Sequence, residues 1–310
     1  APNLSPDVIA LDSPMLTEAA PVVQPLDARL AADDLADFYP FALQAARVNN
    51  QLDGLPFAAD ALGLAYSTTA YAVPPQTWID LHDIGPLWLP LADPAALVTL
   101  QQYLSLGGAL TDTAGEPSMD PVLLAEVLAH YEVMQISGTL PAASLAVGDP
   151  SQTWATFREN RAVAASAFAG QYLADRTRVT ASAFTLIPTR DGNRLTLTNQ
   201  WNLALVATDP ARQVVALDLM RWLTAPDNLG VWTFAAGVLP TRSGALAAWS
   251  DPAAKALAGE ALAAAVPVPS PELLAVIGPP VMAAVQAVLK GQATPEEAAK
   301  RAAEMIAQKS

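Results

Sequence analysis

Two amides and an indole follow one another at Asn199, Gln200 and Trp201, at the start of an apolar run over residues 201–207. Amide groups donate and accept hydrogen bonds, and an indole ring packs against the C–H groups of a ligand. A few convergent polar groups beside an aromatic surface are typical of a small-molecule site. Binding of a ligand such as a sugar explains this cluster, and hydrogen bonding between two parts of the protein is the alternative.

A similar mixture of polar and aromatic side chains recurs where other predicted strands end. These residues are Asp12, Ser13, Asp60, Gln171 and Tyr172. In open α/β sheets, ligands bind beside the ends of strands, so these positions are candidates for ligand contact. Structural interpretations stay open, because Tyr172 can pack on the helix that follows it and Asp60 can be a solvated surface group.

The sequence contains none of the common catalytic or phosphate-binding motifs, such as G-x-S-x-G, H-E-x-x-H or G-x-x-x-x-G-K. It has no cysteine, which excludes disulfides, thiolate metal ligands and a cysteine nucleophile. Its two histidines, His82 and His130, are not joined by ligand spacing to an acidic cluster, so we expect no metal and no cofactor. A carboxylate-dependent glycoside hydrolase stays an alternative, because two carboxylates need only meet in space.

The net charge and the length of the chain bear on its possible partners and on its number of domains. The net charge of −14 argues against a nucleic-acid partner, because neutralising phosphates requires clustered Lys and Arg. A chain of 310 residues can bury a large core, and two domains are expected. The sequence has no uninterrupted apolar stretch of about 18 residues, so it predicts no membrane-spanning segment. The first residues, APNLSPDV, lack a secretion signal, so the protein is either intracellular or its signal has been removed.

Predicted strands separated by helices over most of the chain indicate a mixed α/β fold. The clearest helix starts at Asp209-Pro210, where Asp can cap the first amides and Pro gives up an N–H that would lie unpaired. Apolar residues at helical spacing then form the stripe of an amphipathic helix. These residues are Ala211, Val214, Val215, Leu219 and Trp222.

Four motifs carry a resemblance to a known family: W-L-T-x-P-x-N at 222–228, G-x-L-P-T-R at 237–242, G-L-P-x-x-x-D at 54–60 and P-x-T-W-x-x-L at 75–81. With them the chain resembles the extracytoplasmic solute-binding proteins of ABC importers, in particular the branch of the maltose and oligosaccharide binders. The resemblance implies a two-lobed, periplasmic-binding-protein-like fold of type II.

The resemblance also implies where the two lobes divide. Lobe one is expected to comprise residues 1–57 and 199–239, and lobe two residues 58–198 and 240–310. The expected chain crossings are residues 55–60, 188–199 and 237–241. Relatives begin with a strand, a long helix and a second strand before the P-D-V strand, whereas this chain starts at that third element. Lobe one is therefore expected to lack its first β-α-β unit.

As a function, the resemblance implies a binding protein and no enzyme: a receptor that captures a small solute between two hinged lobes and delivers it to a membrane permease. Asp12, Ser13, Asp60 and Tyr172 fall where the family places ligand contacts, and Gln171 is a neighbour of Tyr172. An extracytoplasmic location follows, with tethering through a lipid anchor outside the present residues.

The chemical class of the solute is open at this point. The aromatic rings of Tyr172 and Trp201 favour a sugar or oligosaccharide. Asp12, Asp60 and the acidic net charge favour a cation such as a polyamine. A non-binding relative that serves as a sensor or interaction domain is a further alternative.

Overall fold

The protein consists of two compact units in a computed structural model that describes residues 6–82 and 84–309. Unit 1 comprises residues 1–61 and 198–268, and unit 2 comprises residues 62–197 and 269–310. The chain therefore passes between the units at 61/62, 197/198 and 268/269.

Unit 1 combines a small antiparallel sheet with helices. Its strands are β1 (Val8–Asp12), β2 (Arg47–Val48), β3 (Gln51–Leu52), the first part of β4 (Leu55–Ser67), most of β8 (Thr196–Leu205) and β9 (Ala265–Pro267). Its helices are α1 (Ser13–Ala19), α2 (Ala32–Leu35), α3 (Pro40–Ala45), α9 (Pro210–Thr224), α10 (Pro226–Ala236), α11 (Ser243–Ala247) and α12 (Pro252–Ala263).

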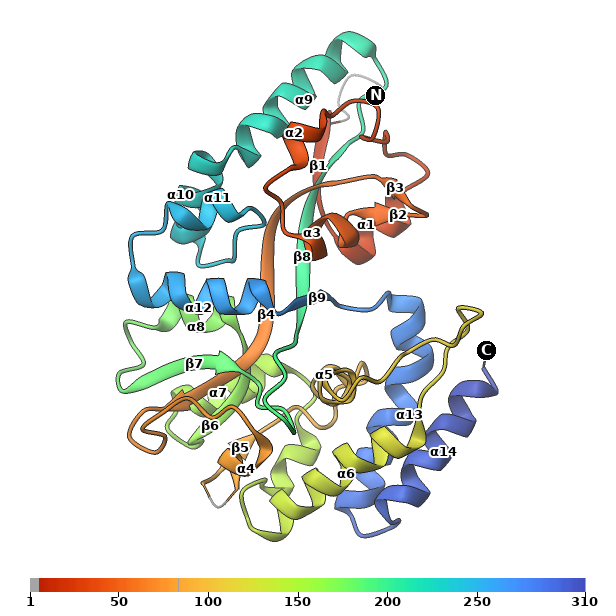
Figure 1. Cartoon of the computed structure of the whole chain (residues 1–310), viewed down its shortest axis with the longest axis vertical. Helices are drawn as coiled ribbons and strands as arrows, with labels where there is room; N and C mark the ends of the chain where they lie inside the picture. The colour runs from red at the N-terminus through yellow and green to blue at the C-terminus, as the bar shows by residue number, and fades with distance from the viewer. Residues whose placement is uncertain (1–5, 83, 310) are drawn as a thin grey trace. The chain divides into compact units, whose positions relative to one another are not determined.

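The centre of unit 1 is the antiparallel sheet β1-β8-β4, in which β8 and β4 lie side by side (Figure 1). Val8 lies opposite Leu205 at one end of the β1–β8 pair, and Asp12 lies opposite Trp201 at the other. β4 pairs with the second edge of β8 and contains a bulge between Pro56 and Ala58. The P-D-V strand and the apolar run that starts at Trp201 thus meet in one sheet.

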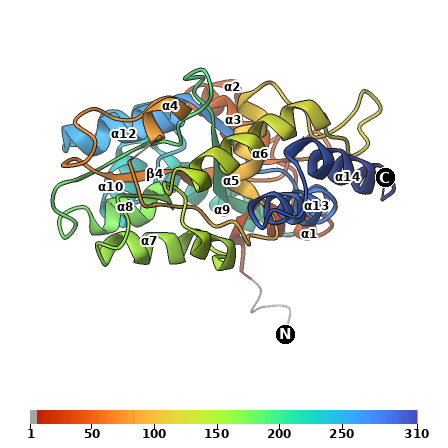
Figure 2. The ribbon, with the colours of Figure 1, turned by 90° about the horizontal axis from the view of Figure 1, so that it is seen from below.

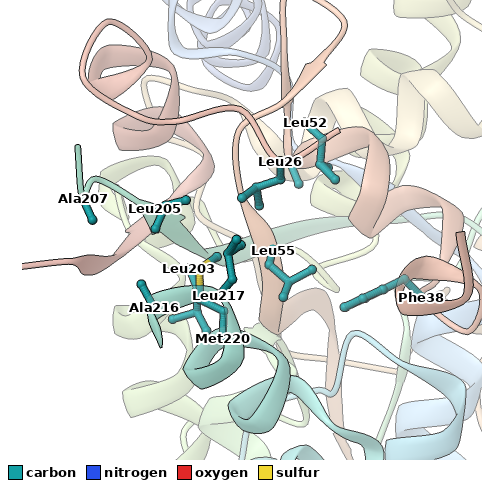
Figure 3. Close-up of a cluster of buried hydrophobic side chains, with 11 residues drawn as sticks. Leu26, Phe38, Leu52, Leu55, Leu203, Leu205, Ala207, Ala216, Leu217 and Met220 are labelled. Carbon is teal, nitrogen blue, oxygen red and sulfur yellow. The ribbon is translucent and has the colours of Figure 1, made fainter. Parts of the chain in front are cut away.

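Helix α9 packs on this sheet through a side that the sequence did not predict. Leu217 and Met220 point from α9 toward Leu203 and Leu55 (Figure 3), and both are buried. Most of the predicted apolar stripe lies outside the core, with exposed fractions of 47% to 69% for Val214, Val215, Leu219 and Trp222. The helix is apolar on two sides, so spacing alone could not identify the side that faces the sheet.

Residues 240–268 belong to unit 1, which corrects the expected boundary between the lobes. The segment after α10 pairs with β4, because Leu239 and Ala59 exchange backbone hydrogen bonds of 2.8 and 2.9 Å. α11 then packs on α10, and the indole N–H of Trp249 lies 3.3 Å from Thr233 Oγ1. The third crossing therefore lies at 268/269 instead of within 237–241.

Unit 2 holds the remaining elements. Its strands are the second part of β4, β5 (Leu87–Trp88), β6 (Ala164–Phe168) and β7 (Ser182–Leu186). Its helices are α4 (Trp78–Leu81), α5 (Leu97–Ser105), α6 (Pro121–Ile136), the 3-10 helix η1 (Ala142–Ala146), α7 (Pro150–Arg158), α8 (Ala169–Asp175), α13 (Pro271–Leu289) and α14 (Pro295–Ala307).

In unit 2 the strands form a mixed sheet, and three long helices pack together. β4 pairs antiparallel with both β6 and β7, while β5 and β6 are parallel. Figures 1 and 2 both show α6, α13 and α14 side by side. Among the described residues, only α13 is long and apolar enough to span a membrane, and its buried residues, such as Ile277 and Val281, mark it as a core helix of unit 2.

Candidate functional site

Four of the predicted site residues lie on one face of the β1-β8-β4 sheet. Asp12 lies opposite Trp201, and Asp60 lies opposite Asn199. Directly opposed residues of an antiparallel pair project to the same face, as do residues two apart on one strand. Asp12, Trp201, Asn199 and Asp60 therefore form a continuous polar and aromatic surface, which we call the acidic–aromatic face.

The acidic–aromatic face is accessible although the sheet below it is packed. Its four residues are partly exposed, whereas Ala58, which lies opposite Trp201 on β4, is only 1% exposed. Asp12 Oδ1 accepts the backbone N–H of Met15 at 2.8 Å and so caps helix α1. This bond fixes the carboxylate, and Oδ2 can still accept a hydrogen bond from a ligand hydroxyl.

Gln200 lies on the opposite face of the sheet, where strand alternation places it. It is 1% exposed, and its Nε2 donates to Ala42 O at 2.9 Å and to Asn202 Oδ1 at 2.7 Å. Ser13 is the first residue of α1, and its Oγ is buried without a hydrogen-bond partner in the described part of the chain. The side chains of Gln200 and Ser13 are therefore not part of the acidic–aromatic face: Gln200 points to the other face of the sheet, and Ser13 belongs to helix α1.

Gln171 and Tyr172 belong to unit 2 and have structural contacts there. Gln171 Oε1 accepts the backbone N–H of Phe168 at 2.9 Å, which caps α8. Tyr172 is 9% exposed, its hydroxyl donates to Ser182 O at 3.1 Å, and its ring lies 5.6 Å from that of Phe184. The packing interpretation accounts for these contacts of Tyr172, and a ligand role for either residue stays a prediction.

The two histidines meet in unit 2, in the core and outside the candidate site. The ring of His130 stacks on Trp78 with centroids 4.2 Å apart, and the ring of His82 lies 5.7 Å from it. Burial, assisted by His82, lowers the pKa of His130 to about 3. Within residues 6–82 and 84–309, no cluster of three or more potential ligands could hold a metal ion.

A second aromatic surface in unit 1 involves Trp232, which is not among the residues that the sequence marks as candidates. Trp232 is 45% exposed, and its ring lies 5.4 Å from that of Phe57. Phe57 sits at the bulge of β4, next to Ala58 and therefore near Trp201 in the register. No sequence signal marks this bulge, so the pairing of these rings could not be predicted.

Solved structures with a similar fold cover nearly the whole chain. Maltose-bound MalE3 of T. maritima is 21% identical with a TM-score of 0.75, over 99% of this chain and 85% of that one. The cyclic alpha-maltosyl-1,6-maltose binding protein of Arthrobacter globiformis is 18% identical with a TM-score of 0.81, over 98% and 84%. The extracellular solute-binding protein of Staphylococcus aureus in complex with maltose is 18% identical with a TM-score of 0.78, over 99% and 84%. These likenesses establish the two-lobed fold of solute-binding proteins.

Family membership rests on the sequence itself. No curated protein sequence matches the chain. The profile described as bacterial extracellular solute-binding protein matches residues 1–258, which is most of the chain. This family consists of binding proteins that act outside the cytoplasm, so it favours a receptor over the hydrolase alternative. The chain belongs to the family of bacterial extracellular solute-binding proteins.

Proposed function

We propose that the protein is the solute-binding component of an ABC importer and that it carries a sugar or oligosaccharide to the membrane permease. Membership of the extracellular solute-binding family supports the receptor role. The ligands named for three similar structures, maltose twice and a cyclic maltosyl-maltose once, support the sugar. A polyamine has no such support.

The acidic–aromatic face is the observation that carries this proposal. Carboxylates at Asp12 and Asp60 accept hydrogen bonds from hydroxyl groups, and the amide of Asn199 both donates and accepts. The indole of Trp201 stands between the two carboxylates in the register and offers a surface for sugar C–H groups. A sugar needs these two kinds of contact together, whereas a polyamine uses only the carboxylates.

Delivery to a permease requires that ligand binding change the protein. A ligand shifts a conformational equilibrium only through its different affinities for the two states. Three chain connections join the units, and short connections of this kind act as hinges in binding proteins. Gln171 and Tyr172 remain the predicted contributions of unit 2 to the binding of the sugar.

A thermal-shift panel tests the ligand class. The purified protein is melted with maltose, maltotriose, monosaccharides, amino acids and spermidine at a series of concentrations. Binding stabilises the folded state by RT ln(1 + [L]/Kd), which is roughly 2.7 kcal/mol at a hundred times Kd. We expect a saturable rise in melting temperature with one or more sugars. A response to spermidine alone would refute the sugar, and no response to any solute would favour a non-binding relative.

Calorimetric titration of variants tests the site. Asp60→Asn removes a charge that accepts hydrogen bonds from ligand hydroxyls, and such bonds contribute roughly 1.5–3 kcal/mol. We therefore expect the Kd for the sugar to rise about 10-fold to 100-fold. Trp201→Leu keeps an apolar residue but removes the aromatic surface, and we expect it to raise the Kd for the sugar as well. Asp33→Asn on the exposed surface of α2 is the matched control and leaves the Kd unchanged. Unaltered affinity in both site variants would place the site elsewhere.

A further inference from the structure

Strands β4 and β8 stop pairing where the chain passes between the two units. Their last residue pair is Ala61 and Thr198, which both belong to unit 1. Continuing the register by one residue would place Leu62 opposite Leu197, but Leu62 pairs with Phe168 of β6 instead. Leu197, the last residue of unit 2 before the chain returns to unit 1, therefore lies beyond the end of this ladder.

The side chain of Gln101 takes the place of a strand neighbour at Leu197. Its Oε1 accepts the backbone N–H of Leu197 at 3.0 Å. Gln101 lies on α5 in unit 2, and both residues are 0% exposed. A buried backbone N–H needs a partner, because leaving it unpaired costs free energy comparable to a lost hydrogen bond. Gln101 therefore ties the second connection to a helix of unit 2, at the last residue of that unit.

The other end of the Gln101 side chain shows that this bond is kept at a cost. Its Nε2 is buried and has no hydrogen-bond partner within residues 6–82 and 84–309. A buried donor without a partner lowers stability, and such a group in a native protein calls for an explanation. Turning the amide by 180° would place Nε2 against the N–H of Leu197, so this backbone donor fixes the orientation of the amide. A core residue that breaks the rule of satisfied polar groups is typical of a functional position.

Gln102, the next residue of α5, has the contacts of a purely structural amide. It is 3% exposed, its Oε1 accepts the indole N–H of Trp78 at 2.7 Å, and its Nε2 donates to Pro188 O at 3.0 Å. Both ends of the amide are satisfied, and neither partner is a residue of a crossing between the units. Gln102 thus separates the effect of losing a buried amide from the effect of releasing the connection.

Two further bonds hold the residues on either side of Leu197. Thr196 Oγ1 donates to Leu62 O at 2.6 Å within unit 2, and Val268 N donates to Thr198 O at 3.2 Å within unit 1. Thr196 and Thr198 are both buried. The step from Leu197 to Thr198 is therefore the point at which the chain changes from contacts in unit 2 to contacts in unit 1.

We propose that Gln101 is a positioning residue for the hinge between the units. By holding Leu197 it fixes the unit 2 end of the second connection, so that bending is confined to the step from Leu197 to Thr198. Asn199 of the acidic–aromatic face follows directly, so the same bond sets where this strand of the proposed site leaves unit 2. Hinges are a few residues at the ends of elements that absorb a change in backbone angles. The inference rests on the proposed receptor function, in which the units move when a solute binds.

Two leucine variants on α5 distinguish a hinge role from a role in the core. Gln101→Leu and Gln102→Leu each remove a buried amide, so a lower melting temperature is expected for both. Only Gln101→Leu releases the N–H of Leu197. Hydrogen exchange of this amide, followed by NMR, should accelerate about 10-fold, the effect of losing one hydrogen bond of ordinary strength. In Gln102→Leu the exchange rate at Leu197 should keep the wild-type value.

Spin labels measure the motion of the hinge itself. The sequence has no cysteine, so one cysteine introduced in each unit takes a label at a single position. Ala256→Cys on α12 in unit 1 and Met305→Cys on α14 in unit 2 place the labels at exposed positions. Without ligand, the distribution of distances between the labels should be wider in Gln101→Leu than in the wild type. In Gln102→Leu the distribution should be unchanged.

These ligand-free measurements stay decisive if the proposed function fails. A thermal-shift panel without any sugar response would refute the sugar receptor and leave both comparisons of the α5 variants intact. A folded Gln101→Leu protein with wild-type exchange at Leu197 and a wild-type distance distribution overturns the proposal. So does a Gln102→Leu distribution as wide as that of Gln101→Leu, which would show a general loosening of unit 2. If Gln101→Leu does not fold, Gln101→Met replaces it, because its flexible side chain fills nearly the same space.

Discussion

The packing of α13 leads to a quantitative prediction at Gly278, a glycine in the middle of a long helix. A Cβ atom added at this position would overlap Pro94 O and lie 2.9 Å from Ala95 Cα. Both atoms belong to backbone, so no side-chain rotation can relieve the overlap. The glycine is therefore required by the close approach of the helix to residues 94–95, although glycine is a poor helix former.

The substitution Gly278→Ala has two opposite effects on the free energy of unfolding, one from helix propensity and one from packing. The gain in helix propensity from glycine to alanine stabilises by at most about 1 kcal/mol. Overpacking of a filled core costs about 1–3 kcal/mol, and contact with rigid backbone places Gly278 at the upper end of that range. We therefore expect a net loss of about 1–2 kcal/mol. For domains of 150–250 residues this corresponds to a melting temperature lower by roughly 2–8 °C.

Gly259 in helix α12 is the matched control, because the helix propensity term is the same but space is available. Its added Cβ would meet only Leu246 Cδ2 at 3.6 Å, an ordinary van der Waals distance. Gly259→Ala is expected to stabilise by roughly 0.5–1 kcal/mol. Scanning calorimetry of both variants measures the shifts in melting temperature, which should be negative for Gly278→Ala and positive for Gly259→Ala. A Gly278→Ala protein as stable as the wild type would refute the close packing of α13.

Two further predictions concern buried ionisable groups. The folded-state pKa of His130, about 3, lies below the unfolded value near 6.5, so the unfolded chain takes up the proton first as pH falls. Stability should drop by about 2 kcal/mol between pH 6.5 and pH 5, and urea titrations should show this drop reduced in His130→Phe. Arg242 is 8% exposed, bonds to Asp37 at 2.6 Å and covers the Phe38 ring at 3.9 Å. Asp37 is 30% exposed, so water can solvate it when Arg242 is removed, and Arg242→Ala should destabilise by roughly 1.5–3 kcal/mol. Arg161→Ala, at an exposed pair, should change stability by less than about 1 kcal/mol.

Helix starts could be predicted from the sequence because their signals are local. Asp209 accepts the N–H groups of Ala211 and Arg212 at 2.8 and 3.0 Å, and Pro210 is the first helical residue. The capping box at Thr294 and Glu297 likewise begins α14. In each case a cap and its target lie within three residues, so no tertiary information is needed.

Long-range packing decided the features that the sequence left open. Residues 33–48 have the apolar spacing of one helix, but they form the end of α2 and the separate helix α3, because Pro40 starts a new helix. Strand β4 continues without a break through Gly63, although glycine weakens the interior of a strand. A side chain at Gly63 would collide with the ring of Phe184 on β7, and glycine fits there for that reason. Such a contact joins positions far apart in sequence and leaves no local signal.

The candidate site shows the same division between local and tertiary information. Strand alternation was sufficient to separate Gln200 from Asn199 and Trp201, since neighbouring residues of a strand face opposite sides. The prediction that all three residues form one cluster is therefore wrong for Gln200, which points to the other face of the sheet. The pairing of Asp60 with Asn199, and of Asp12 with Trp201, depends on the register of three strands. Register is a tertiary property, so those neighbours could not be predicted.

The position of the acidic–aromatic face on β4 and β8 bears directly on how binding could be transmitted. Asp60 and Asn199 are each the second residue from a crossing, because the chain leaves unit 1 after Ala61 and returns to it at Thr198. Strands β4 and β8 form two of the three connections between the units. A ligand held by Asp60 and Asn199 would therefore act on the backbone beside both of these connections. In the proposed site, coupling between ligand binding and hinge motion requires no long chain of intermediate contacts, because Asp60 and Asn199 also lie beside the connections between the units. A substitution at Asp60 should therefore alter the conformational change as well as the affinity, whereas one at Asp12, on the edge strand, should alter affinity alone.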